Sequence, residues 1–319
     1  MTTATTTADD LIDYARLAAR LRPLAAEYPR AEPYPHVVLD DFLDREVARR
    51  LVAEFPPIDP AGWTNYTHVN ERKYGRSDRR VFPPTIGRVV DLLNASAFLR
   101  ILQDLTGIAG LLADPSLEGG GLHQSGRGGY LNIHADFTGH PHRPTWRRRV
   151  NLLLYLNDAW ADEYGGHLEL WSRDVSRCVR RIAPVFDRAV VFSTDADAFH
   201  GHPEPMTCPE GVTRKSLALY YFTEEPERFR VRSTEYRARP GDGVRAVAIY
   251  LDKMALRGYD RAKRTLGLDD VFASRMLRGL ARLRAAEAPV AGVVSGPTPP
   301  RSRHARMVQP PSSCHHPGG

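Results

Sequence analysis

The stretch GGYLNIHADF, residues 128–137, carries the pattern from which both the fold and the chemistry can be worked out. In a β-strand, side chains two positions apart share a face, so His134 and Asp136 point the same way. An imidazole and a carboxylate at this spacing can occupy neighbouring positions on one metal ion. Because His-x-Asp is common by chance, it indicates a metal site only if other parts of the chain supply further ligands.

The sequence around this stretch predicts short strands rather than alternating strands and helices. Apolar or alternating runs of strand length recur from about residue 118 onward, and turn residues separate them. This spacing favours a sandwich or a barrel over βαβ units. The expected strands are 120–125, 129–134, 149–156, 166–171, 178–183, 188–193 and 214–222.

A candidate for the third ligand lies in RAVVFSTDADAFHGHPEP, residues 188–205, which begins as a buried strand and passes through a polar turn to His200 and His202. A solvated loop histidine is the alternative for this segment taken by itself. Strand periodicity cannot choose between the two histidines. We favour His200, because it directly follows the turn and because two prolines stiffen the chain beyond His202. Two histidines and one carboxylate that leave one face of an octahedron open suit non-haem iron(II). A zinc hydrolase with the same three ligands is the alternative.

An anion-binding residue is expected in TRKSLALYYF, residues 213–222. A lone arginine at the start of an apolar strand is costly to bury without an anionic partner. The planar guanidinium suits a bidentate contact with a carboxylate. The sequence therefore predicts that Arg214 binds a carboxylate ligand, unless it lies on the surface at the strand end.

Taken together, these features resemble the prolyl-4-hydroxylase-type branch of the iron(II)/2-oxoglutarate-dependent dioxygenases. The resemblance covers roughly residues 34–226 and is strongest over 128–222, where it includes VNLLLYLNDAW at 150–160 and GGHLELW at 165–171. It implies a mainly β fold with flanking helices and a double-stranded β-helix core, which is a cupin-like jelly roll with the metal at its open mouth.

The resemblance also implies an activity: hydroxylation of an unactivated C–H bond by dioxygen, coupled to conversion of 2-oxoglutarate into succinate and carbon dioxide. Fe(II) would be held by His134, Asp136 and His200, and the distal carboxylate of 2-oxoglutarate by Arg214. Ascorbate is a candidate reductant. The substrate stays open among a prolyl residue, a free amino acid and a small biosynthetic intermediate, because fold does not fix substrate. A cupin-like binding protein without turnover is the alternative from another class.

Three further residues are candidates for contact with the co-substrate or the substrate. Tyr155 matches a position where related enzymes place a tyrosine hydroxyl on the distal carboxylate of 2-oxoglutarate. Tyr130 and Asn132 share the strand face of His134 and are weaker candidates. Ordinary packing inside the barrel is the alternative for all three.

The sequence as a whole predicts four segments. They are an N-terminal leader and helix at 1–33, the dioxygenase domain at 34–226 with its catalytic core at 118–224, a helical extension at 227–287 and a disordered tail at 288–319. A second set of predictions concerns helices, expected over 9–28, 45–55, 84–94, 97–106, 244–257 and 269–285. The polar residues 58–82 are expected to form a long irregular loop.

The net charge of +6 and the pI near 9.3 fit an anionic substrate or co-substrate. HPHRPTWRRR, residues 140–149, is expected as a basic loop that overhangs the iron and meets such a substrate, or else as a solvated loop. The sequence has no recognised nucleic-acid motif and no apolar run of about 20 residues, so neither nucleic acid nor a membrane is expected as a partner. Without a secretory signal the expected location is the cytoplasm, where the three cysteines would be free thiols.

Overall fold

The computed structural model describes residues 11–59 and 62–266, and the statements below concern these residues. They belong to a compact unit that spans Met1–Ser274. The helix expected at 269–285 and the tail expected at 288–319 lie outside the described residues. In the part of the chain that is described, no helix is long and apolar enough to cross a membrane.

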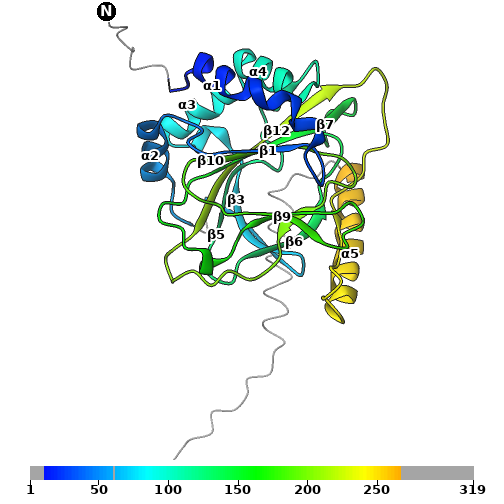
Figure 1. The fold of residues 1–319 in the computed structure, drawn as a ribbon. Helices are drawn as coiled ribbons and strands as arrows, with labels where there is room; N and C mark the ends of the chain where they lie inside the picture. Colours follow the sequence, from blue (N-terminus) through cyan, green and yellow to red (C-terminus); the bar gives the residue numbers. More distant parts are fainter. Residues whose placement is uncertain (1–10, 60–61, 267–319) are drawn as a thin grey trace, which may run out of the picture. The chain divides into compact units, whose positions relative to one another are not determined.

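The unit is built on one sheet of 13 strands that curls upon itself (Figure 1). The main path runs β1-β10-β7-β12-β5-β3-β6-β11-β8-β9, with β2 paired to β3, β4 to β12 and β13 to β6. The predicted mainly β fold with flanking helices and a jelly-roll core is confirmed. The strands are β1 (His36–Leu39), β2 (Thr64–His68), β3 (Glu71–Arg76), β4 (Leu112–Ala113), β5 (Gly121–Ser125), β6 (Tyr130–Ala135), β7 (Trp146–Tyr155), β8 (Leu168–Trp171), β9 (Cys178–Ile182), β10 (Arg188–Ser193), β11 (His200–His202), β12 (Arg214–Glu224) and β13 (Glu235–Tyr236).

The central strands bury apolar side chains on both of their faces. On one face, alternate residues such as Leu152 of β7 and Leu219 of β12 form the larger core with helices α1 to α4. On the other face, Val190 and Phe192 of β10 pack with Leu170 of β8 in a second core inside the curled sheet. We call this second face, which lies inside the curled sheet, the inner face. Side chains from different strands can meet there. The helices are α1 (Tyr14–Leu21), α2 (Arg45–Glu54), α3 (Pro84–Leu93) and α4 (Ser96–Thr106).

The helix boundaries follow from local sequence signals. The Asp44 side chain accepts a hydrogen bond of 2.9 Å from the backbone N–H of Glu46 and so caps α2. Gly107 ends α4 in the left-handed conformation, with φ of 70°. The helices predicted over 45–55, 84–94 and 97–106 are confirmed. The helix predicted over 9–28 is α-helical only in α1, and the chain tightens into a 3-10 turn where Pro23 cannot donate a backbone hydrogen bond.

The irregular loop predicted over 58–82 is wrong, because a β-hairpin lies there. β2 and β3 are joined by the two residues Val69 and Asn70, and β3 also pairs with β5 and β6. The sequence hid these strands because β3 buries the charged Glu71 instead of an alternating set of apolar side chains. Glu71 and Lys73 share a face of β3, where their ion pair of 2.9 Å compensates both charges.

The chain beyond β12 returns to the sheet. β13 pairs with β6 in the register Glu235↔Ala135 and Tyr236↔His134. The helix predicted over 244–257 is α5 (Arg245–Leu266), which extends further than the prediction. Figure 1 shows α5 beside β6 and β9.

We expect Leu152→Ala to lower the free energy of unfolding by about 2–5 kcal/mol, because Leu152 is fully buried between the sheet and the helices. Leu251→Ala on α5 is the matched control, since this leucine is 61% exposed and its truncation should cost less than about 0.5 kcal/mol. Urea unfolding curves measure both. Equal losses in the two variants would contradict the assignment of the larger core.

Candidate active site

The curled sheet brings together the three side chains that were predicted as metal ligands. His134 of β6 and His200 of β11 are cross-strand partners, and their ring centroids lie 4.5 Å apart. Asp136 follows β6, and its carboxylate oxygens lie 3.5 Å from Nε2 of His134 and 3.5 Å from Nε2 of His200. One ligand atom from each residue lies within 4.8 Å of the others. This spacing suits a shared metal ion.

The two imidazoles are oriented by the backbone. Nδ1 of His134 lies 2.9 Å from the carbonyl oxygen of Asn132, and Nδ1 of His200 lies 3.0 Å from that of Ala198. Each Nδ1 can donate its proton to that carbonyl, which leaves the Nε2 lone pairs directed toward Asp136. Burial and the nearby His134 lower the pKa of His200 to about 4, so its imidazole is neutral at pH 7, as metal binding requires.

Asp136 is kept ionised by two donors on β7. Nη2 of Arg148 donates to its Oδ2 at 2.9 Å, and Nδ2 of Asn151 donates to the same oxygen at 2.8 Å. Burial alone would raise the pKa of Asp136, but Arg148 and the two imidazoles hold it well below its usual range. The carboxylate is therefore fixed in the charged form that a metal ligand needs.

Sequence reasoning missed both of these donors. Asn151 could have been found from the sequence, because it lies four residues before Tyr155 in the same strand and so shares a face with Tyr155. Arg148 was hard to recognise because it lies in a run of arginines typical of a solvated surface. The residue is only 2% exposed, and its guanidinium carbon lies 3.4 Å from the ring centroid of Tyr220. Nη1 of Arg148 has no hydrogen-bond partner among the described residues.

His202 is separate from the three clustered residues although it is also buried. A register shift between His200 and His202 pairs the latter with Leu131 rather than with a metal-site residue. Its Nδ1 has no partner in the described part of the chain. Burial and nearby positive charges, Arg214 foremost, keep the pKa of His202 well below its usual value. His202 is thus a buried neutral side chain that does not join the three clustered residues.

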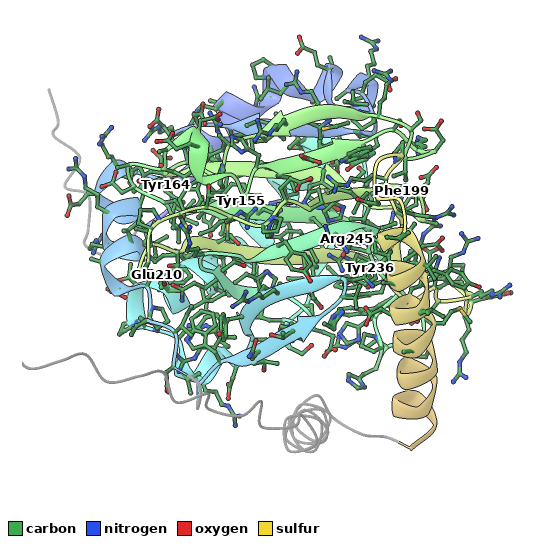
Figure 2. All side chains as sticks on the ribbon, turned by 90° about the horizontal axis from the view of Figure 1, so that it is seen from below. Tyr155, Tyr164, Phe199, Glu210, Tyr236 and Arg245 are labelled. Carbon is green, nitrogen blue, oxygen red and sulfur yellow. The ribbon has the colours of Figure 1, made fainter. Side chains whose placement is uncertain are left out.

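Arg214 and Tyr155 form a second polar pair inside the barrel. Nε of Arg214 donates to the carbonyl oxygen of Gly166 at 2.7 Å, and Nη2 donates to the hydroxyl of Tyr155 at 3.2 Å. The residue is 7% exposed, and no carboxylate among the described residues pairs with it. Burial raises the pKa of Tyr155, so its phenol keeps its proton. Figure 2 shows Tyr155 among the side chains of the barrel interior.

The structure does not bring Tyr130 or Asn132 to this pair. The hydroxyl of Tyr130 donates to the carbonyl oxygen of His68 at 3.1 Å, and Nδ2 of Asn132 donates to that of Val69 at 3.1 Å. Both side chains thus bind the turn of the β2–β3 hairpin, and a role for them in co-substrate binding stays a prediction.

The stretch 140–149 is not a free basic loop, because β7 begins at Trp146 and most of its basic groups have protein partners. Buried His140 lies 3.3 Å from a carboxylate oxygen of Asp114, and the guanidinium of Arg143 stacks on Trp146. Of these basic residues, the structure shows only Arg148 in contact with the triad.

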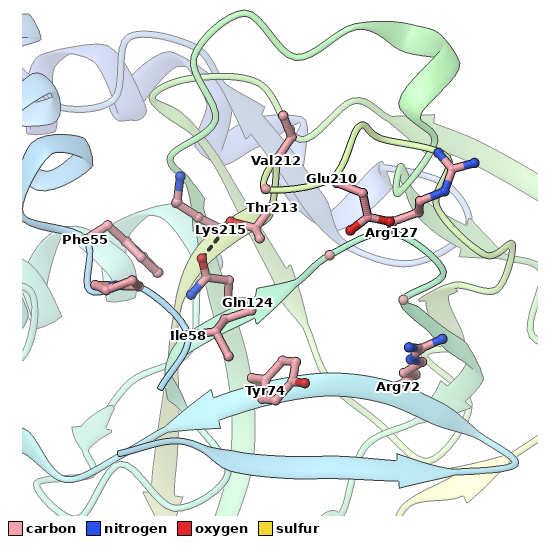
Figure 3. Close-up of a pocket in the computed structure, with 14 residues that line it drawn as sticks. Phe55, Ile58, Arg72, Tyr74, Gln124, Arg127, Glu210, Val212, Thr213 and Lys215 are labelled. Carbon is pink, nitrogen blue, oxygen red and sulfur yellow. Dashed lines mark hydrogen bonds between the residues drawn. The ribbon is translucent and has the colours of Figure 1, made fainter. Parts of the chain in front are cut away.

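A separate cavity of about 510 Å³ lies on the opposite face of the sheet (Figure 3). Its wall includes a row of cross-strand neighbours, namely Lys215 of β12, Gln124 of β5 and Tyr74 of β3. Because side chains alternate along β12, Arg214 points away from this cavity and into the barrel. The cavity therefore does not belong to the site that holds the triad.

Residues 120–222 match the family model of the 2OG-Fe(II) oxygenase superfamily. The matched residues contain strands β5 to β11 and nearly all of β12, which form most of the barrel. The matched range contains the triad, Tyr155 and Arg214. The chain is accordingly an iron(II)- and 2-oxoglutarate-dependent dioxygenase, as predicted. A comparison with curated proteins finds no match.

Several solved structures of oxygenases are similar to the chain. A prolyl-4-hydroxylase of Pseudomonas putida is 18% identical, with 64% of this chain and 99% of that chain covered and a TM-score of 0.48. A prolyl hydroxylase of Trichoplax adhaerens, in complex with a hypoxia inducible factor peptide fragment, is 18% identical (65% and 91% covered, TM-score 0.47). HygX of Streptomyces hygroscopicus, with nickel, 2-oxoglutarate and hygromycin B bound, is 16% identical (61% and 85% covered, TM-score 0.38).

We expect His200→Ala to abolish stoichiometric iron binding and His202→Ala to retain most of it, because only His200 lies with the other two candidate ligands. Anaerobic titration with Fe(II), followed by metal analysis of the desalted protein, measures the difference. The reverse result would move the third ligand by two residues along β11.

Proposed function

We propose that this oxygenase hydroxylates an unactivated C–H bond of a prolyl, amino-acid or small biosynthetic substrate and converts 2-oxoglutarate into succinate and carbon dioxide. One observation carries the proposal. A buried cluster of two imidazoles and a carboxylate shares the barrel interior with a buried arginine, Arg214, that has no anionic partner among the described residues.

The triad fits Fe(II) in its donor chemistry. His134 and His200 would bind through Nε2, because Nδ1 of each faces a backbone carbonyl. Asp136 would bind as a carboxylate, since Arg148 and Asn151 hold it in the charged form. Two imidazoles and one carboxylate occupy half of an octahedron and leave room for a co-substrate. Bound iron would supply the activation of dioxygen that amino-acid side chains cannot provide.

The Arg214–Tyr155 pair fits the distal carboxylate of 2-oxoglutarate. The guanidinium would pair with the carboxylate charge, and the protonated phenol of Tyr155 would donate a hydrogen bond to it. Without an anion, a buried guanidinium would carry a large desolvation cost. The carbonyl of Gly166 fixes Nε of Arg214 and the hydroxyl of Tyr155 accepts from Nη2, so Nη1 is left to face the ligand.

The substrate would lie beside Arg148. Its Nη2 is engaged by Asp136, whereas Nη1 is buried without a partner among the described residues, so it can donate to a carbonyl or carboxylate oxygen of the substrate. The guanidinium rests on the ring of Tyr220, which fixes the direction of that donor. An amino-acid-like or peptide substrate has the acceptor that this group requires, and a carboxylate would suit its charge.

Succinate release tests the proposal against its alternatives. Purified protein is supplied with Fe(II), dioxygen, ascorbate and 2-oxoglutarate, alone and with candidate substrates, and succinate is measured. We expect turnover that requires iron and is lost in Asp136→Ala. A hydrolase that uses the same triad would release no succinate, and a binding protein would bind iron without turnover. Either result would contradict the proposal.

We expect Arg214→Ala to weaken 2-oxoglutarate binding by roughly a hundredfold, because the buried carboxylate loses its charged partner. Lys215→Ala is the matched control: it removes a neighbouring cation on the opposite sheet face and should change the affinity less than about twofold. Isothermal titration of the metal-loaded protein with 2-oxoglutarate compares them. Unchanged affinity in Arg214→Ala would exclude this residue as the anchor.

A further inference from the structure

The strongest unassigned feature is the C-terminal strap, residues 229–254, which lies beyond the segment matched by the family model. The strap follows the edge of β6 where the candidate ligands lie. The backbone N–H of Arg237 donates to the carbonyl oxygen of Ile133 at 2.9 Å, and that of Thr138 donates to Arg232 at 3.0 Å. The strap therefore borders the whole stretch that carries His134 and Asp136.

The register places an aromatic ring against His134. Residues directly opposite in antiparallel strands share a face and lie close together. His134 is opposite His200 of β11 on one edge and opposite Tyr236 of β13 on the other. The ring centroids of His134 and Tyr236 are 5.5 Å apart, and Tyr236 is 6% exposed. His134 is thus flanked by rings on both sides, and Figure 2 shows Tyr236 near the start of α5.

Ion pairs on α5 hold the strap in this position. Lys253 lies 3.3 Å from Glu235, the residue before Tyr236. Asp252 lies 2.8 Å from Nδ1 of His68 at the end of β2, and the His68 ring meets the ring of Tyr236 edge-on at 6.2 Å. Burial alone would lower the pKa of His68, but its carboxylate neighbours raise it to about 9, so this contact is charged at neutral pH.

We propose that Tyr236 is a positioning residue for the metal centre, whose ring fixes the imidazole of His134 on the side away from His200. The hydrogen bond from Nδ1 fixes one end of the imidazole, and the ring contact limits its tilt. A ligand held in its binding orientation loses less conformational freedom when the metal binds. The inference rests on the proposed role of His134 as an iron ligand.

The test is metal affinity, with Co(II) as an air-stable probe of the full-length protein. We expect Tyr236→Leu to weaken Co(II) binding about three- to tenfold and to alter its visible absorption, which reports ligand geometry. Tyr236→Phe keeps the ring and should restore both the affinity and the spectrum. Tyr250→Ala, which truncates a 56% exposed tyrosine of the same strap, is the control and should match the wild type.

A second variant tests the inference in case Tyr236→Leu does not fold. Asp252→Ala/Lys253→Ala cuts the α5 contacts to His68 and Glu235 without altering a residue beside the metal, and it should also weaken Co(II) binding. Wild-type affinity in every folded variant would overturn the inference. His134→Ala separates this failure from a failure of the proposed function: if its Co(II) binding equals that of the wild type, the proposed metal site is wrong, and the inference falls with it.

Discussion

The pairing of β6 with β11 is the constraint on which the site depends. The register His134↔His200 sets two imidazoles side by side on the inner face, and Asp136 follows on the same face two residues later. A shift of one residue would turn each candidate ligand on the moving strand to the opposite face, so the candidate metal site exists only in this register. The bulge after His200 then pairs His202 with Leu131, which separates the two histidines of one short strand. Backbone pairing, rather than side-chain attraction, therefore assembles the triad.

The same pairing buries the carboxylate of Asp136, and without a bound metal its negative charge must be stabilised by neighbouring side chains. Burial would push Asp136 toward the neutral form, in which it would be a poor ligand. The amide of Asn151 and the guanidinium of Arg148 prevent this. The same guanidinium lies over the ring of Tyr220, and its Nη1 has no partner among the described residues. Arg148 therefore stabilises the charge of Asp136 and still has a donor group available.

Strand periodicity placed His134 and Asp136 on one face. His200 was chosen from the turn before it, and Tyr155 came from the family resemblance. The sequence pattern failed to predict strands in which a buried charge is paired with an opposite charge. In the hairpin of β2 and β3, Glu71 forms an ion pair with Lys73, so the strand shows no alternation of apolar and polar residues. Arg148 was hidden for the same reason. Tyr236 could not be placed, because a two-residue strand that pairs with β6 leaves no local signal, and only the closed sheet shows its partner.

Two of these failures share a location: the hairpin and the strap lie outside the matched segment, and both pair with β6, the strand that carries His134. Asp252 of α5 bonds to His68 and Asn70 of the hairpin, and both segments pair with β6. The matched segment alone provides the three candidate metal ligands and Arg214, the candidate anchor of the co-substrate. The charged contact between Asp252 and His68 joins the hairpin to the strap, beside the strand that carries His134.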